Sequence, residues 1–247
     1  MAATLQLTKT ESKLFVRDPI ALFFGLVFPA VLLFALGYLY PGFDEPSADL
    51  DGKRYIDVYA PIALVLGLAT LGLVTMPPIF GAYRQFGILR RLRTTPVHPV
   101  RLLSAQLIVH VAVAVAAAAL AIGVVVTAFD VPVPESPLWF LLSFLLAAAS
   151  IFAIGLLVGA RASTQVSGQA IGMAIYFPML FFAGVWIPRS VMPDGLLAVS
   201  DLTPLGSAVQ ALEDSWFGAT PSLLNLTVML AYALVVGLVA VRGFRWE

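Results

Sequence analysis

Residues 102–129 read LLSAQLIVHVAVAVAAAALAIGVVVTAF and contain no aspartate, glutamate, lysine or arginine. A helix that crosses a membrane needs about 20 consecutive apolar residues, so this stretch is long enough to span. The whole chain has the same character, because 60% of its 247 residues are hydrophobic, 11% are charged and the mean hydropathy is +0.96. A soluble domain carries about 25% charged residues. The sequence therefore predicts an integral membrane protein.

Five other stretches share this length and this freedom from charge. A charged side chain at the centre of a bilayer costs about 2.5–3.5 kcal/mol on insertion scales, so charge-free stretches are the ones that can span. We therefore predict one all-α transmembrane domain, residues 1–247, with six spanning helices. The predicted spans are 20–40, 58–80, 102–129, 138–160, 166–187 and 222–241.

The basic residues predict the orientation of the chain. Cytoplasmic loops of membrane proteins carry an excess of lysine and arginine. If both termini are cytoplasmic, eleven of the fourteen basic residues fall inside, and only Lys53, Arg54 and Arg189 fall outside. We therefore predict a multi-pass protein of the inner or plasma membrane of the cell, with both termini in the cytoplasm.

Two segments outside the predicted spans have their own patterns. Residues 1–18 mix apolar and basic side chains ahead of Pro19, which favours an interfacial amphipathic helix over a frayed polar tail. Residues 188–220 hold apolar pieces that are too short to span and are broken by proline and glycine. Such pieces enter a bilayer only where protein or water covers their backbone. We predict short re-entrant helices here, with an ordinary surface loop as the alternative.

The residues that the sequence lacks exclude several kinds of chemistry. The chain has no cysteine, and therefore neither disulfides nor thiolate metal sites. It has no GxxxxGK[ST] loop to hold nucleotide phosphates. Its histidines, His98 and His110, have no acidic residue near them in the sequence, and we interpret His110 as a polar contact between helices. We therefore predict no catalytic site, no metal and no cofactor on this chain, and an outside source of energy.

A basic segment follows the second predicted span. Residues 83–101 read YRQFGILRRLRTTPVHPVR and contain five arginines. Apolar residues recur every third position from Tyr83 to Leu92 while the arginines occupy the remaining circumference, which predicts a short amphipathic helix from Tyr83 that is broken before Pro96. The arginines alone could serve only topology and lipid phosphates. The apolar stripe favours a second interpretation, a helix that lies in a groove of a soluble partner.

Residues 84–97, RQFGILRRLRTTPV, resemble the cytoplasmic motif of the type-two (ABC-2) ABC exporter permeases, the class that includes the daunorubicin-resistance permeases. Other segments agree in the same order along nearly the whole chain. These are Arg17-Asp18-Pro19 with Pro29, Ser163-Thr164-Gln165, and FAGVWIP at 182–188 followed by Met192-Pro193 and Leu202-Thr203-Pro204. One residue departs from the family pattern, because Gln85 stands where the family often has an acidic residue.

The resemblance implies the membrane subunit of an ATP-driven exporter that works as a homodimer, or as a heterodimer with a related permease. Two copies of a separate ATPase would hold the ATP and Mg, and the amphipathic N-terminal helix would support the loop that docks in each ATPase. The other expected partners are membrane lipids, and nucleic acid is not among them. By match of motif, the ATPase-coupling residues are Tyr83, Arg84, Phe86, Gly87, Leu89, Arg90, Leu92 and Pro96.

We place the translocation path at the dimer seam, where spans one and five supply small, polar and aromatic residues. The candidates are Phe24, Phe28, Gly168, Gln169, Gly172, Tyr176, Phe177 and Phe181. Ordinary helix packing is the alternative role for each of them. An uncharged path favours a hydrophobic or amphipathic cargo, such as a drug-like molecule (hence multidrug resistance) or a lipid, and a polysaccharide or glycolipid is the alternative cargo. The alternative functions are ion-coupled transport through Asp57 or Asp130 and a non-transporting scaffold.

Overall fold

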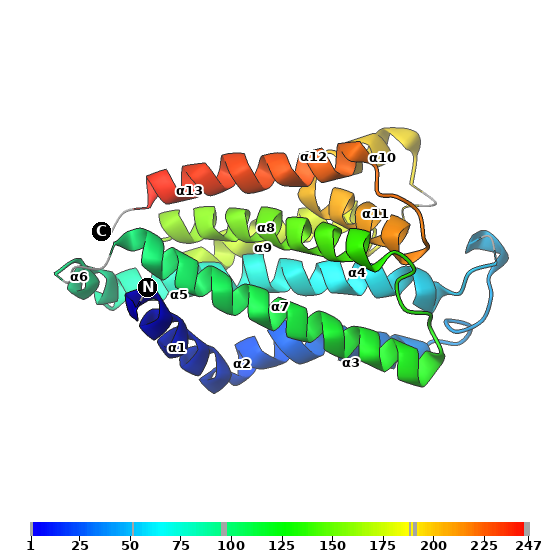
Figure 1. Ribbon diagram of the computed structural model, residues 1–247, viewed down its shortest axis with the longest axis horizontal. Coiled ribbons are helices and arrows are strands. Elements are labelled where there is room, and N and C mark those ends of the chain that lie inside the picture. Colours follow the sequence, from blue (N-terminus) through cyan, green and yellow to red (C-terminus); the bar gives the residue numbers. More distant parts are fainter. Residues whose placement is uncertain (1, 51, 95–97, 188, 190–191, 245–247) are drawn as a thin grey trace.

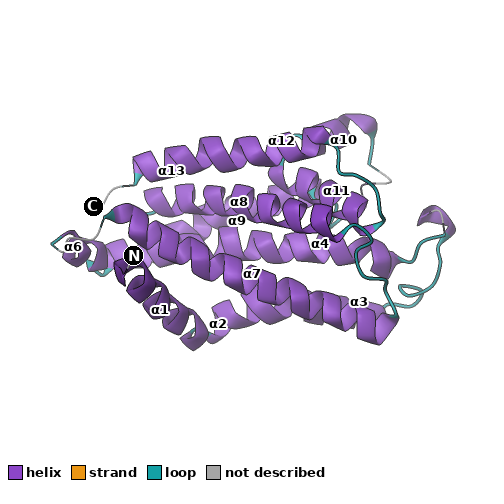
Figure 2. Cartoon of the chain, viewed as in Figure 1, coloured by secondary structure: helices purple, strands orange, loops and turns teal. Residues whose placement is uncertain are grey.

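The computed structural model describes residues 2–50, 52–94, 98–187, 189 and 192–244. Over these residues the chain is built from helices joined by turns and loops, with no β-strand (Figure 2). In chain order the helices are α1 Ala2–Arg17, α2 Pro19–Leu22, η1 Phe23–Val27, α3 Phe28–Leu39, η2 Ala48–Leu50, α4 Tyr55–Ala69, η3 Thr70–Thr75, α5 Met76–Gln85, α6 Ile88–Arg93, α7 Pro99–Phe129, α8 Pro137–Arg161, α9 Gln165–Phe182, α10 Asp194–Asp201, α11 Pro204–Trp216, α12 Leu223–Ala231, η5 Tyr232–Val236 and α13 Gly237–Gly243.

Five helices of the described chain are long and apolar enough to cross a membrane, which confirms the predicted all-α integral membrane protein. They are Pro19–Leu39, Tyr55–Gln85, Val100–Phe129, Pro137–Arg161 and Leu223–Gly243. The sixth predicted span, 166–187, falls on α9. This helix has 18 residues with Gln165, Ser167 and Gln169 near its start, and it ends at Phe182 rather than at residue 187 because Gly184 adopts a left-handed conformation with φ of 82°. The number of spans therefore stays a prediction.

Two of the spanning helices contain a π-helical turn just before a proline. The turn η1 precedes Pro29, and the turn η3 precedes Pro77. Proline has no N–H to donate, and its ring clashes with the carbonyl one turn earlier. The wider π turn accommodates this clash, so each span continues without a break.

The helices form an elongated bundle with both chain ends and α6 at one end (Figure 1). The opposite end carries α10, α11 and the loop between α3 and α4. The span Tyr55–Gln85 is the most enclosed, with 78% of its most apolar part buried, against 17% for the span Leu223–Gly243. The position of both termini at the same end of the bundle agrees with their predicted location in a single compartment.

Glycines let the inner helices approach closely. A Cβ added to Gly155 of α8 would lie only 1.9 Å from the carbonyl oxygen of Gly72 in η3. Within a membrane, small residues at such crossings allow backbones to make the dispersion contacts that hold helices together. This crossing therefore fixes α8 against the enclosed span.

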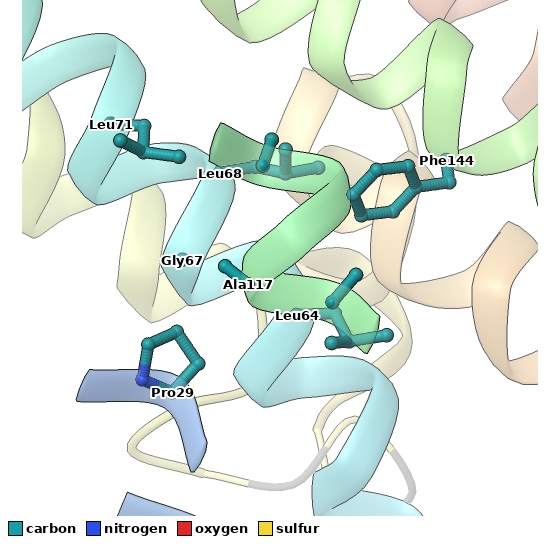
Figure 3. A pocket seen from close by; sticks show the side chains of 9 residues that line it. Pro29, Leu64, Gly67, Leu68, Leu71, Ala117 and Phe144 are labelled. Carbon is teal, nitrogen blue, oxygen red and sulfur yellow. The ribbon is translucent and has the colours of Figure 1, made fainter. Parts of the chain in front are cut away.

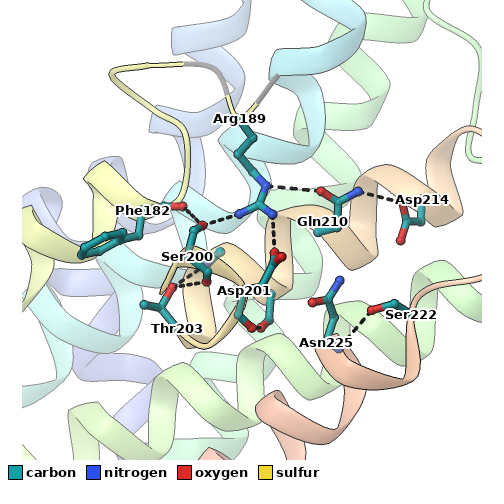
Figure 4. Close-up of polar contacts among 11 residues, drawn as sticks. Phe182, Arg189, Ser200, Asp201, Thr203, Gln210, Asp214, Ser222 and Asn225 are labelled. Carbon is teal, nitrogen blue, oxygen red and sulfur yellow. Dashed lines mark hydrogen bonds and ion pairs between the residues drawn. The ribbon is translucent and has the colours of Figure 1, made fainter. Parts of the chain in front are cut away.

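Two short helices, α10 and α11, occupy the predicted re-entrant segment. The buried guanidinium of Arg189 joins them, because it donates to Ser200 Oγ, to Asp201 Oδ1 at 2.5 Å and to Gln210 Oε1 at 3.3 Å (Figure 4). The buried Trp216 donates from Nε1 to the carbonyl of Pro132 at 3.1 Å. These contacts hold the segment against the bundle, while its depth in a bilayer stays a prediction.

Candidate functional site

The last three residues of α5 and the residues that follow them form a bent connection toward α7, which we call the elbow, residues 83–94. Helix α5 ends at Gln85, and Gly87 takes a left-handed conformation with φ of 69° before α6 begins at Ile88. The prediction of one continuous amphipathic helix from Tyr83 is therefore wrong. Glycine adopts positive φ at little cost and commonly ends helices in this way. Pro96, another predicted coupling residue, lies outside the described residues.

Among the side chains of the elbow that the structure describes, two apolar and two basic ones are exposed, beside Gln85 and Thr94. Phe86 is 64% exposed, and Ile88, Arg90 and Arg91 are exposed as well. Leu89 is fully buried, and Leu92 is partly buried against the core. The surface open to a partner thus combines two apolar side chains with two arginines, while the buried leucine packs within the chain.

Tyr83 faces inward and joins three helices. Its hydroxyl donates to Glu11 Oε2 of α1 at 2.6 Å, and Gln106 Nε2 of α7 donates to the same oxygen at 2.6 Å. Burial raises the pKa of the Glu11 carboxyl, although both hydrogen bonds act in the opposite direction. We missed this contact in the sequence. One signal was present, since Glu11 stands four residues from both Leu7 and Phe15, on the apolar side of α1.

Arg84 also faces inward, toward the end of α8. Its guanidinium donates to the carbonyl oxygens of Gly159, Ala160 and Ala162 at 2.6, 2.7 and 2.6 Å. It also lies over the ring of Phe244, 5.4 Å from the centroid. The last carbonyls of a helix have no partners within the helix and carry the negative end of its dipole. Arg84 therefore satisfies the C-terminus of α8.

Three of the predicted path residues face the interior of the chain. A Cβ added to Gly168 would lie 2.7 Å from the carbonyl oxygen of Pro77, and one added to Gly172 would lie 2.0 Å from that of Leu73. The hydroxyls of Tyr176 and Thr70 are 3.1 Å apart. Thr70, Leu73 and Pro77 belong to η3 and α5. The structure thus brings these path residues together against the enclosed span.

The other predicted path residues lie toward the surface. Phe24, Gln169 and Phe177 are exposed, and Phe28 and Phe181 are partly buried. On the first span, the rings of Phe24 and Phe28 contact each other at a centroid distance of 5.5 Å. The exposed members on α9 share one side of that helix, because eight residues separate them.

A small apolar cavity lies beside the enclosed span (Figure 3). Its volume is about 10 Å³, and its lining includes Pro29, Leu64, Gly67 and Phe144. This is about the space of one water molecule, whereas pockets for drug-sized ligands have about 300–1,000 Å³. The cavity is therefore a packing defect and not a place for cargo.

Comparison with known families gives a match over most of the chain. The family model described as ABC-2 type transporter matches residues 2–217. This range runs from α1 through α11, so it includes the elbow and every predicted site residue. Curated proteins give no match to the chain.

Proposed function

Because the chain belongs to the ABC-2 type transporter family, of which it is a permease subunit, we propose that it exports a hydrophobic or amphipathic substrate from the cytoplasm by coupling to a separate ATPase. The observation that carries this proposal is the exposed surface of the elbow. Phe86 and Ile88 project there beside Arg90 and Arg91, at the end of the bundle where both termini lie (Figure 1).

The chemistry of this surface indicates what would bind it. Apolar side chains that protrude beyond the bundle gain stability by entering a groove of a soluble protein. Arginines at the rim favour a partner with acidic residues and speed its association. The elbow therefore fits an apolar cleft with an acidic rim on each ATPase. The positive-inside rule favours a cytoplasmic location for this end of the bundle, where ATP is available.

The outward side of α9 supports a permease dimer. Gln169 and Phe177 are both exposed there. A side-chain amide without a hydrogen-bond partner is costly in hydrocarbon, and polar residues of spanning helices commonly bond across to another helix. A second permease, identical or related, would cover this side of α9, and the aromatic rings of Phe24 and Phe177 would line the seam for an apolar or amphipathic cargo.

The test compares two equally exposed aromatic residues at opposite ends of the bundle. Phe86 is 64% exposed and Tyr40 is 63% exposed. Each would be replaced by alanine in a permease co-expressed with its tagged ATPase, and ATP-driven uptake of ethidium and of a fluorescent phospholipid would be measured in inverted vesicles. We expect Phe86→Ala to lower co-purification about tenfold or more, as for a binding hot spot, and Tyr40→Ala to leave it unchanged.

Two results would contradict the proposed function. One is a wild-type permease that binds no ATPase. The other is uptake that a pH gradient drives without any nucleotide, which would favour the ion-coupled alternative. Equal co-purification of the two variants would place the docking surface elsewhere on the chain.

A further inference from the structure

The elbow is joined to the turn between α8 and α9 by two adjacent side chains. Arg84 donates to the carbonyl oxygens of Gly159, Ala160 and Ala162 at 2.6–2.7 Å. The next residue, Gln85, accepts a hydrogen bond at Oε1 from the backbone N–H of Gln165, the first residue of α9, at 3.2 Å. One side chain therefore holds the last turn of α8, and its neighbour holds the first turn of α9.

Backbone packing reinforces this connection. A Cβ added to Gly81 would lie 2.1 Å from the carbonyl oxygen of Thr164, so α5 and the turn touch with no side chain between them. Thr164 is itself tied to α9, because its Oγ1 accepts from Ser167 N at 3.1 Å and its N–H donates to Ser167 Oγ at 3.0 Å. The path from the elbow to α9 thus contains no flexible linker.

Arg84 differs from Arg90 and Arg91, two other arginines of the elbow. Arg90 and Arg91 are exposed, whereas Arg84 is partly buried and directs its guanidinium into the bundle. A planar guanidinium presents several donors in a fixed fork, which suits three carbonyls of one helix end better than a lysine would. The geometry therefore separates arginines that face a partner from one that fixes the elbow.

We infer that Arg84 is a positioning residue that clamps the elbow to the α8–α9 turn, so that the elbow, the end of α8 and the start of α9 move as one body. This inference rests on the proposed function, in which the ATPase moves the elbow. The clamp then carries that movement to α9 and so to the exposed Gln169 and Phe177 at the dimer seam. Gln85 assists it by accepting the hydrogen bond from the first residue of α9.

A distance measurement tests the clamp without the ATPase. The chain has no cysteine, so Arg91→Cys and Val166→Cys provide two exposed spin-label sites, one on α6 and one on α9, in the isolated permease in nanodiscs. We expect a narrow distance distribution in the otherwise wild-type chain, a broad one with Arg84→Gln and an intermediate one with Arg84→Lys. Arg90→Gln is the matched control and should leave the distribution narrow. An equally narrow distribution with Arg84→Gln would overturn the inference.

A coupling measurement tests the consequence. With the ATPase present, we expect Arg84→Gln to co-purify as the wild type does but to take up about tenfold less ethidium per ATP hydrolysed, the scale for losing hydrogen bonds from a charged group. Arg90→Gln should instead weaken co-purification, because its side chain is exposed on the docking surface. Wild-type uptake per ATP in Arg84→Gln would refute the clamp while leaving the proposed function intact.

The two ideas fail separately. If the wild-type permease bound no ATPase, the proposed function would fail, and the spin-label distances would still report on the clamp. If Arg84→Gln did not fold, Arg84→Lys and Gln85→Ala would take its place in both measurements. If the spin-label distances and the uptake per ATP in both of these variants stayed as in the wild type, the inference would also be overturned.

Discussion

Gly172→Ala distinguishes a packing role from a path role for α9. Gly172 is buried, and an added Cβ would lie 2.0 Å from the carbonyl oxygen of Leu73, whereas ordinary contact begins at 3.4 Å. The two backbones would have to separate by about 1.4 Å. The obstacle is a carbonyl of the enclosed span and cannot rotate away as a side chain could.

The expected loss of stability follows from this separation. Overpacking of a well-packed contact costs about 1–3 kcal/mol, and the separation would also strain the hydrogen bond between Tyr176 and Thr70, worth about 1 kcal/mol. Alanine returns about 1 kcal/mol through its higher helix propensity. We therefore expect Gly172→Ala to lower the free energy of unfolding by about 2 kcal/mol.

Gly123→Ala is the matched control, because Gly123 lies within the spanning helix α7 and an added Cβ there meets nothing within 4 Å. We expect it to be neutral or to stabilise by up to about 1 kcal/mol. Both variants would be unfolded by titration with SDS in the same detergent, and ethidium uptake would be measured beside it. If Gly172→Ala were as stable as the control but transported differently, the path role would stand and the packing argument would be refuted.

Two further predictions concern α1 and the elbow. Burial raises the pKa of Glu11 above its ordinary value of 4.5, so this carboxyl contributes stability that is fully present below pH 4.5 and is lost as the pH rises through the raised pKa. Thermal unfolding measured from pH 4 to pH 8 should show this decline in the wild type and a flatter profile in Glu11→Gln. Equal slopes of stability against pH in the two proteins would contradict the assignment. Gly87→Ala forces a side chain into the left-handed region at a cost of about 1–2 kcal/mol, whereas asparagine tolerates that conformation. We therefore expect Gly87→Ala to co-purify less with the ATPase than Gly87→Asn does. Equal co-purification of the two variants would contradict a role for the Gly87 conformation in docking.

The spanning helices could be predicted from the sequence because the bilayer imposes one strong local rule. A charged side chain at membrane depth is costly, so the charge-free run 102–129 predicted a spanning helix. The observed helix, α7, ends at the same residue and begins slightly earlier, at Pro99. The rule was weaker for α9. Apolar residues continue past Phe182, and hydropathy alone missed the helix end that Gly184 fixes through its backbone conformation.

The elbow was only partly predictable, because periodicity finds an apolar stripe but not what the stripe packs against. Tyr83 and Leu89 stand on the predicted stripe, and in the structure both are buried within the chain. Of the four residues on the stripe, only Phe86 is strongly exposed. The hydroxyl contact with Glu11 spans 72 positions of the chain, and no local pattern in the elbow encodes such a pair.

The arginines show why counting charges gives orientation but not mechanism. Arg54 and Arg84 stand at opposite ends of the enclosed span, and each donates to carbonyls at the C-terminus of a neighbouring helix, Phe129 of α7 at 2.8 Å for the first and the end of α8 for the second. Arg84 agrees with the positive-inside count and Arg54 departs from it. Both are engaged within the chain, so neither is available to a partner. The enclosed span is therefore held at both ends, and glycine crossings fasten it to α8 and α9 between them. If the proposed ATPase acts on the elbow, its force would therefore reach a span that these crossings fix to α8 and α9.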